Sequence, residues 1–127
     1  MIKVAAAIIQ QNHQFLICQR PAGKHLELLW EFPGGKQELN ETLPECLIRE
    51  CREELGIEVE IESLFEESTY QYPEVSIQFA FYLCKIQSGT PYSREGQHFC
   101  WIHPEDFLKY SFCPADKNVI EKLISSQ

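Results

Sequence analysis

Residues 34–57 read GGKQELNETLPECLIRECREELGI and predict a glycine turn followed by a capped helix. Gly34 and Gly35 lack side chains, so they allow positive φ and let another group approach the backbone closely. Thr42 is the predicted N-cap, and Glu45 three residues later completes a capping box. Gly56 is the predicted stop at the C-terminal end. We therefore expect one helix between Thr42 and Gly56.

Three glutamates of this predicted helix, Glu50, Glu53 and Glu54, lie immediately beside its apolar stripe rather than opposite it. Spacings of i+3 and i+4 make these acids neighbours, so they repel one another unless a cation lies between them. A hard divalent cation such as Mg²⁺ removes the repulsion and keeps coordination positions for water and phosphate oxygens. For this spacing alone, an ordinary charged amphipathic helix is the alternative. The stripe consists of Leu43, Leu47, Ile48, Cys51 and Leu55.

Every fixed letter of the Nudix box, G-x5-E-x7-R-E-U-x-E-E-x-G-U, is present between Gly35 and Ile57. The one departure is Cys51, where a bulky aliphatic residue is usual, and a cysteine is a small hydrophobe that suits a buried position. Because the motif falls in a turn-helix context, the chain is identified as a member of the Nudix family. The resemblance implies a mixed β-sheet sandwiched between helices and a single Nudix hydrolase domain over residues 1–127.

The composition is that of one globular domain without an extended basic surface. A chain of 127 residues, 44% hydrophobic and 24% charged, is the size of one domain with one core. The net charge is −8 and Lys and Arg form no run, so neither a nucleic acid polymer nor a membrane is an expected partner. The apolar run Val4 to Ile9 is too short for a signal sequence or a membrane span, so we expect a cytoplasmic protein.

Cysteines show neither a C-x-x-C pair nor a Cys/His spacing suited to zinc. Several of them fall in apolar strand or helix patterns. We expect reduced core residues rather than a disulfide framework. The six cysteines are Cys18, Cys46, Cys51, Cys84, Cys100 and Cys113.

The rest of the chain alternates predicted strands with loops, an order that indicates an α/β or α+β class. Ile2 to Gln10 and Phe15 to Gln19 predict a first hairpin at an edge of the sheet. Pro114-Ala115-Asp116 opens a second helix. Further strands are predicted at Ile57 to Glu62, Ser68 to Tyr72, Val75 to Ile86 and Phe99 to Ile102, a turn at Pro73-Glu74, and loops at Arg20 to Leu28 and Ser88 to Gln97.

Four flanking segments resemble the MutT branch of the family, the oxidised-dGTP diphosphatases: R-P-x-G-K-H from Arg20, L-W-E-F-P-G-G-K from Leu29, E-G-Q from Glu95 and P-A-D from Pro114. The resemblance implies that a (d)NTP and water give a (d)NMP and pyrophosphate. It implies nucleotide contacts by Arg20 and His25, a base site at Phe32, and bracing by Glu41 and Arg49. The implied Mg²⁺ ligands, for which Mn²⁺ is a possible substitute, are the Gly35 carbonyl, Glu50, Glu53, Glu54 and Glu95.

The residue chemistry agrees with such a reaction, because attack of water at phosphorus needs neutralised phosphate oxygens and a deprotonated water. Glu53 is the expected principal metal ligand, and Glu50 or Glu95 is the expected base. From the residues alone, Arg20, Lys24 and His25 either are solvated or contact phosphate or ribose. A catalytically silent nucleotide-binding module is the rival class, although it has no need of mutually repelling acids. A monomer or weak dimer is expected.

Asp116 departs from the MutT pattern, which has an asparagine at this position. An ionised aspartate only accepts hydrogen bonds, whereas asparagine also donates. P-A-D is also found in a sister branch that hydrolyses cytosine nucleotides modified at position 5, so a 5-modified (d)CTP or a broad range of (d)NTPs is the alternative substrate. The remaining interpretation is that Asp116 is a helix N-terminal acid that binds backbone N–H groups.

Overall fold

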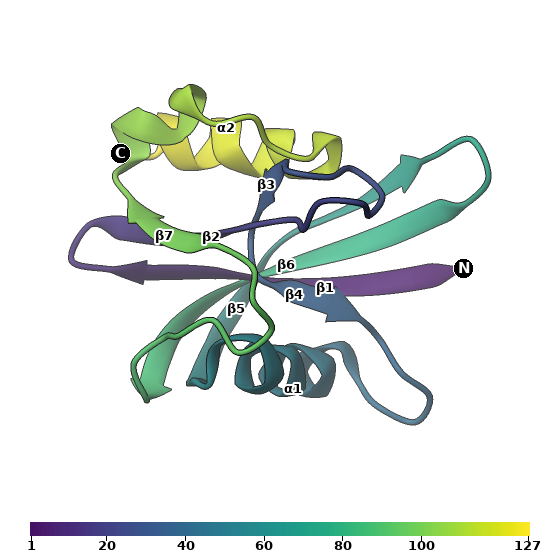
Figure 1. Ribbon diagram of the computed structural model, residues 1–127, viewed down its shortest axis with the longest axis horizontal. Helices are drawn as coiled ribbons and strands as arrows, with labels where there is room; N and C mark the ends of the chain where they lie inside the picture. Colours follow the sequence, from purple (N-terminus) through teal and green to yellow (C-terminus); the bar gives the residue numbers. More distant parts are fainter.

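Seven strands form one mixed β-sheet with helices on both faces, and the computed structural model describes residues 1–127 (Figure 1). α1 (Leu43–Leu55) covers one face, and α2 (Lys117–Ser125) covers the other with two 3-10 helices, η1 (Pro104–Lys109) and η2 (Pro114–Asp116). The predicted sandwich is therefore confirmed. The strands are β1 (Ile2–Gln11), β2 (Gln14–Gln19), β3 (Trp30–Glu31), β4 (Gly34–Lys36), β5 (Glu58–Gln71), β6 (Ser76–Ser88) and β7 (Phe99–Ile102).

β1 lies inside the sheet, so the expectation that the first hairpin forms an edge is wrong. The strand order is β3-β2-β1-β6-β5, with β4 also paired to β1 and β7 to β2. β1 pairs with β6 in parallel, from Ile2 opposite Ile77 to Ile9 opposite Cys84. Residues 5–9 of β1 are buried in succession, because helices cover both faces of the sheet at this strand. A continuous apolar run is typical of such a strand, whereas a strand with one face in solvent alternates apolar and polar residues.

β5 is one long strand where the sequence predicts two short ones. Its pairing with β6 shifts register at three places, between Glu58 and Val59, between Ile61 and Ser63, and between Leu64 and Glu66. Bulges of this kind interrupt the inside-outside alternation on which strand prediction depends. The predicted hairpin turn at Pro73-Glu74 is confirmed, since the Tyr72 N–H donates to the Val75 carbonyl at 2.9 Å.

Two hydrophobic clusters fill the space between the sheet and its helices. One includes Leu47, Leu55 and Ile57 on the α1 side, and the other includes Phe81 and Val119 on the α2 side. All six cysteines are free thiols, and five of them are buried as the apolar patterns predict, whereas Cys100 is half-buried. No helix is both long and apolar enough to cross a membrane.

Candidate active site

α1 begins and ends as its sequence predicts. The Thr42 hydroxyl accepts from the Glu45 N–H at 3.2 Å, and the Glu45 carboxylate accepts from the Thr42 N–H at 2.7 Å. Gly56 adopts the left-handed conformation with φ of 64°, which only glycine adopts without strain. Because the stripe including Leu47 and Leu55 is buried, Glu50, Glu53 and Glu54 are held along one flank of the helix.

The two glycines before α1 form strand β4 rather than a turn. They are required for close approach, because a Cβ on Gly34 would lie 2.0 Å from the Ala5 carbonyl oxygen. A Cβ on Gly35 would lie 2.3 Å from the carboxyl carbon of Glu50. Gly35 has no positive φ, so the expectation of a conformational role at this residue is wrong. The missing side chain instead lets the Glu50 carboxylate lie against the backbone of β4.

Arg49 joins the acids of α1 to the loop that precedes the helix. Its guanidinium donates to both Glu41 carboxylate oxygens, at 2.7 and 3.0 Å, and to the Lys36 carbonyl at 3.1 Å. The same group donates to Glu50 at 3.1 Å and to Glu53 at 3.2 Å. Hydrogen bonds from Arg49 lower the pKa of Glu41 to about 2. Arg49 therefore orients two of the predicted metal ligands and ties them to Glu41.

Glu54 and Glu50 form a crowded carboxylate pair. Burial, followed by the charge of Glu50, raises the pKa of Glu54 to about 9. The Gln97 amide donates to Glu54 at 3.3 Å. Two adjacent acids that resist simultaneous ionisation are a suitable oxygen donor set for a hard divalent cation, which stabilises both charged forms. The residues therefore fit a divalent metal, although no three His, Cys, Asp or Glu side chains are gathered into a metal-binding cluster as they stand.

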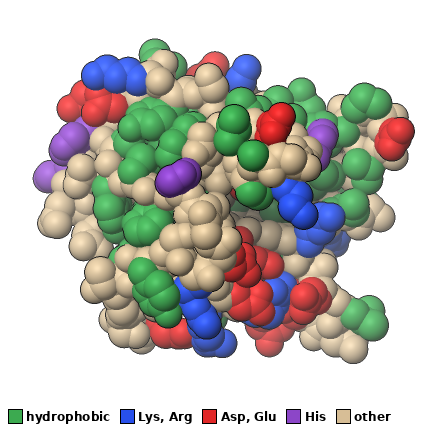
Figure 2. Space-filling model, in the orientation of Figure 1, with side chains coloured by type: hydrophobic (Ala, Val, Ile, Leu, Met, Phe, Trp, Pro, Cys, Tyr) green, Lys and Arg blue, Asp and Glu red, His purple; other side chains and the backbone are tan.

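Glu95 comes to the same end of α1 on the loop between β6 and β7. Its side chain is exposed, and its charge is one of the lesser causes that raise the pKa of Glu54. In the space-filling view, acidic and basic side chains gather over the α1 half of the molecule, below the hydrophobic side chains (Figure 2). The structure thus brings Glu95 toward the helix acids from a distant part of the chain.

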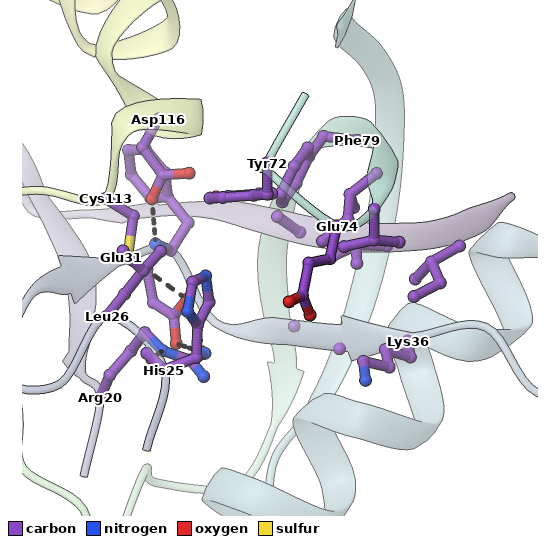
Figure 3. Close-up of a pocket in the computed structure, with 18 of the residues that line it drawn as sticks. Arg20, His25, Leu26, Glu31, Lys36, Tyr72, Glu74, Phe79, Cys113 and Asp116 are labelled. Carbon is purple, nitrogen blue, oxygen red and sulfur yellow. Dashed lines mark hydrogen bonds and ion pairs between the residues drawn. The ribbon is translucent and has the colours of Figure 1, made fainter. Parts of the chain in front are cut away.

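A pocket of about 560 Å³ opens beside β4 and contains the predicted nucleotide-binding residues (Figure 3). Phe32 is 3% exposed and packs against Phe81 and Phe107, so its ring belongs both to the core and to the pocket wall. Lys24 is exposed and does not line the pocket. The lining residues include Arg20, His25, Glu31, Phe32, Gly35, Tyr72, Glu74, Phe79 and Asp116.

Arg20 and His25 close one side of this pocket. The Arg20 guanidinium donates to the His25 carbonyl at 2.7 Å and to the Glu31 carboxylate at 3.4 Å. The His25 ring lies edge-on to Tyr72, with ring centroids 5.1 Å apart. Sequence reasoning missed Glu31 and Tyr72. The only sequence signal that could have indicated Glu31 is its position next to Phe32. Tyr72 gave no such signal, because only the hairpin of β5 and β6 brings it to the pocket.

Asp116 is a buried pocket residue that occupies the N-cap position of α2 without capping the helix through its side chain. Its side chain is 4% exposed and makes no capping hydrogen bond to α2. One carboxylate oxygen accepts from the Phe32 N–H at 3.2 Å. Burial, followed by the nearby Glu31 charge, raises the pKa of Asp116 well above its ordinary value. The expectation of an ionised Asp116 that only accepts hydrogen bonds is therefore wrong. The raised pKa favours a protonated carboxyl, which both donates and accepts hydrogen bonds.

The fold, the acid-bearing helix and the adjoining pocket define a hydrolase of the Nudix type. The chain belongs to the Nudix family, since the model of the NUDIX domain matches residues 4–122. Members of this family generally depend on a divalent metal ion.

Two curated relatives match nearly the whole chain. The 8-oxo-dGTP diphosphatase of Escherichia coli (strain K12) is 37% identical, over 96% of this chain and 95% of its own length. The CTP pyrophosphohydrolase of the same organism is 36% identical, over 98% of this chain and 93% of its own. A solved structure of MutT, from work on Aliivibrio salmonicida and Vibrio cholerae, superimposes with a TM-score of 0.83 at 32% identity, covering 98% of this chain and 96% of that one.

Proposed function

We propose that this protein is a Mg²⁺-dependent nucleoside triphosphate pyrophosphohydrolase that acts on oxidised or non-standard (d)NTPs such as 8-oxo-dGTP. The observation that carries the proposal is the packing of the Glu50 carboxylate against Gly35, at the rim of the pocket that contains Phe32 and Asp116. This arrangement joins a charged metal-binding flank to an apolar cavity large enough for a nucleobase. The name of the 37% identical relative, 8-oxo-dGTP diphosphatase, supports the same substrate class.

Five groups would hold the metal: the Gly35 carbonyl, Glu50, Glu53, Glu54 and Glu95. When bound, Mg²⁺, or Mn²⁺ in its place, neutralises phosphate charge and makes a coordinated water easier to deprotonate. Arg49 keeps Glu50 and Glu53 oriented through its hydrogen bonds to both.

In the proposed reaction, Glu50 or Glu95 accepts the proton of the attacking water. The water oxygen bonds to phosphorus as the anhydride bond between the α- and β-phosphates breaks, and the products are a (d)NMP and pyrophosphate. Arg20 and His25, which line the pocket, would contact the nucleotide from the loop of residues 20–28. Phe32 supplies an aromatic wall for the base.

Asp116 is the proposed base-reading residue. As a protonated carboxyl it both donates and accepts, as an asparagine does, although asparagine has a second donor. A 5-modified (d)CTP, or a broad range of (d)NTPs, is the second candidate substrate. The 36% identical relative named CTP pyrophosphohydrolase favours that candidate. We further propose that residues 1–127 act as one domain, in the cytoplasm, as a monomer or weak dimer.

The deciding experiment is pyrophosphate release from 8-oxo-dGTP, dGTP, dCTP and 5-methyl-dCTP, with and without Mg²⁺. Metal-dependent release with a preference for 8-oxo-dGTP is the expected result. A preference for 5-methyl-dCTP would select the second candidate. Nucleotide binding without turnover in any metal would identify a silent module and overturn the proposal.

A further inference from the structure

The loop of residues 89–98, between β6 and β7, is bound to the C-terminal end of α1. The last four carbonyl groups of a helix have no partner inside it and must find one elsewhere. The Tyr92 N–H donates to the Leu55 carbonyl at 3.1 Å, and the Arg94 N–H donates to the Glu54 carbonyl at 3.0 Å. The Arg94 guanidinium donates to the Arg52 carbonyl at 3.1 Å. The loop therefore binds three of the four carbonyl groups at this helix end.

Shape and charge both favour this docking. The ring of Tyr92 lies so close to Gly56 that a Cβ on the glycine would be 2.4 Å from a ring carbon. A Cβ on Gly89 would lie 2.9 Å from the Gly56 carbonyl oxygen. The positive charge of Arg94 lies at the negative end of the α1 dipole, where a cation is stabilising. Loop and helix therefore pack as one unit.

The docked loop brings Gln97 to an acid of α1 and holds Glu95 next to the backbone contact between Arg94 and Glu54. Glu95 directly follows Arg94, and Gln97 donates to the Glu54 carboxylate at 3.3 Å. The Ser93 hydroxyl donates to the Gln97 carbonyl at 2.6 Å, which fixes the turn between these residues. The position of Glu95 relative to Glu54 therefore depends on how the loop is attached to the helix end.

We propose that Arg94 is a positioning residue, whose side chain holds Glu95 beside the acids of α1 so that loop and helix contribute carboxylates to one metal ion. This inference rests on the proposed function, because it assumes that these carboxylates bind a divalent cation. Arg94 itself touches neither metal nor substrate and acts only through Glu95.

The test compares Mn²⁺ binding by isothermal titration calorimetry in the wild type, Arg94→Ala, Arg94→Lys and Lys109→Ala. Residues that orient metal ligands typically contribute about ten- to a hundredfold in metal affinity. We expect Arg94→Ala to weaken Mn²⁺ binding about tenfold, and Arg94→Lys to recover part of the loss. Lys109→Ala removes the same charge from η1, on the opposite face of the sheet, and should leave the affinity unchanged. The nucleotide KM at saturating Mn²⁺ should change less than twofold in Arg94→Ala.

A double-mutant cycle separates positioning from a general structural effect. If Arg94 acts through Glu95, Arg94→Ala should cause no further loss of Mn²⁺ affinity in a Glu95→Gln background. Additive losses, or unchanged affinity in Arg94→Ala alone, would overturn the inference. Should Arg94→Ala unfold, the same cycle is run with Arg94→Gln, which keeps a hydrogen-bond donor. Because Mn²⁺ binding is measured without turnover, an inactive wild type would refute the proposed hydrolysis and leave this test intact.

Discussion

Replacement of Gly35 by alanine should lower the catalytic rate while leaving the stability of the fold nearly unchanged. The new Cβ would lie 2.3 Å from the carboxyl carbon of Glu50 and 2.5–2.6 Å from its oxygens. The obstructing atoms are the end of a flexible side chain, so Glu50 can rotate away without a shift of the backbone. To reach an ordinary contact of 3.4 Å the carboxyl carbon must move by 3.4 − 2.3 = 1.1 Å. That movement displaces Glu50 from Arg49, with which it now shares a hydrogen bond of 3.1 Å.

The two consequences of this displacement differ greatly in size. Alanine in a strand is favoured over glycine by about 0.5–1 kcal/mol, and a partly exposed ion pair such as Arg49–Glu50 contributes about 0.2–1 kcal/mol, so the two effects nearly cancel. A catalytic group that is misplaced by about 1 Å loses about a hundredfold in rate. Gly35→Ala should therefore keep its melting temperature within a few degrees and lose about a hundredfold in kcat.

The matched control is Gly34→Ala, whose Cβ would lie 2.0 Å from the Ala5 carbonyl oxygen and 2.8 Å from the Ala6 Cα. These are backbone atoms of β1, so this variant should lose stability as well as activity. Thermal melting and Mg²⁺-dependent pyrophosphate release are measured on both variants. A Gly35→Ala protein with wild-type kcat, or one that melts as early as Gly34→Ala, would refute the reasoning.

Four further predictions concern the metal site and Asp116. Glu53→Gln should keep the fold but lower turnover by at least about a hundredfold, and near-normal rates in saturating Mg²⁺ would contradict its role as a principal ligand. Millimolar Mg²⁺ or Mn²⁺ should raise the melting temperature, because a metal at ten times its Kd adds about 1.4 kcal/mol to the free energy of unfolding. An unchanged melting curve would count against metal binding to the folded acids. Burial raises the pKa of Asp116 above its ordinary 3.8, so the contribution of its protonated carboxyl to stability is complete below pH 3.8 and is lost as the pH rises through the folded pKa. The melting temperature of Asp116→Asn should therefore rise relative to that of the wild type between pH 5 and pH 8. A difference in melting temperature that stays constant with pH would disprove this. Asp116→Ala should change the kcat/KM ratios among 8-oxo-dGTP, dGTP, dCTP and 5-methyl-dCTP by about ten- to two-hundredfold, whereas constant ratios would mean that the base is read elsewhere.

Local sequence was sufficient to predict α1 and the placement of its acids. The capping box of Thr42 and Glu45 and the stop at Gly56 involve residues at most four positions from their partners. Such interactions depend on the helix alone, so they are readable without knowledge of the rest of the chain. The turn at Pro73-Glu74 was predictable for the same reason, since its hydrogen bond joins Tyr72 and Val75, three residues apart.

Only the tertiary structure determined the environment of Asp116, the position of β1 and the attachment of the Glu95 loop. The Phe32 N–H that binds Asp116 lies 84 residues away in the chain. β1 lies inside the sheet because it pairs in parallel with β6. β5 was not recognised as one strand because its bulges depend on its pairing with β6. The shifted pKa values of Asp116 and Glu54 arise from burial and from neighbouring charges that the fold brings together. The hydrogen-bonding capacity of a side chain follows from its residue type and can be read from the sequence. Its desolvation and its distance from other charges depend on segments far apart in the chain, and these are fixed only when the sheet and its helices pack together.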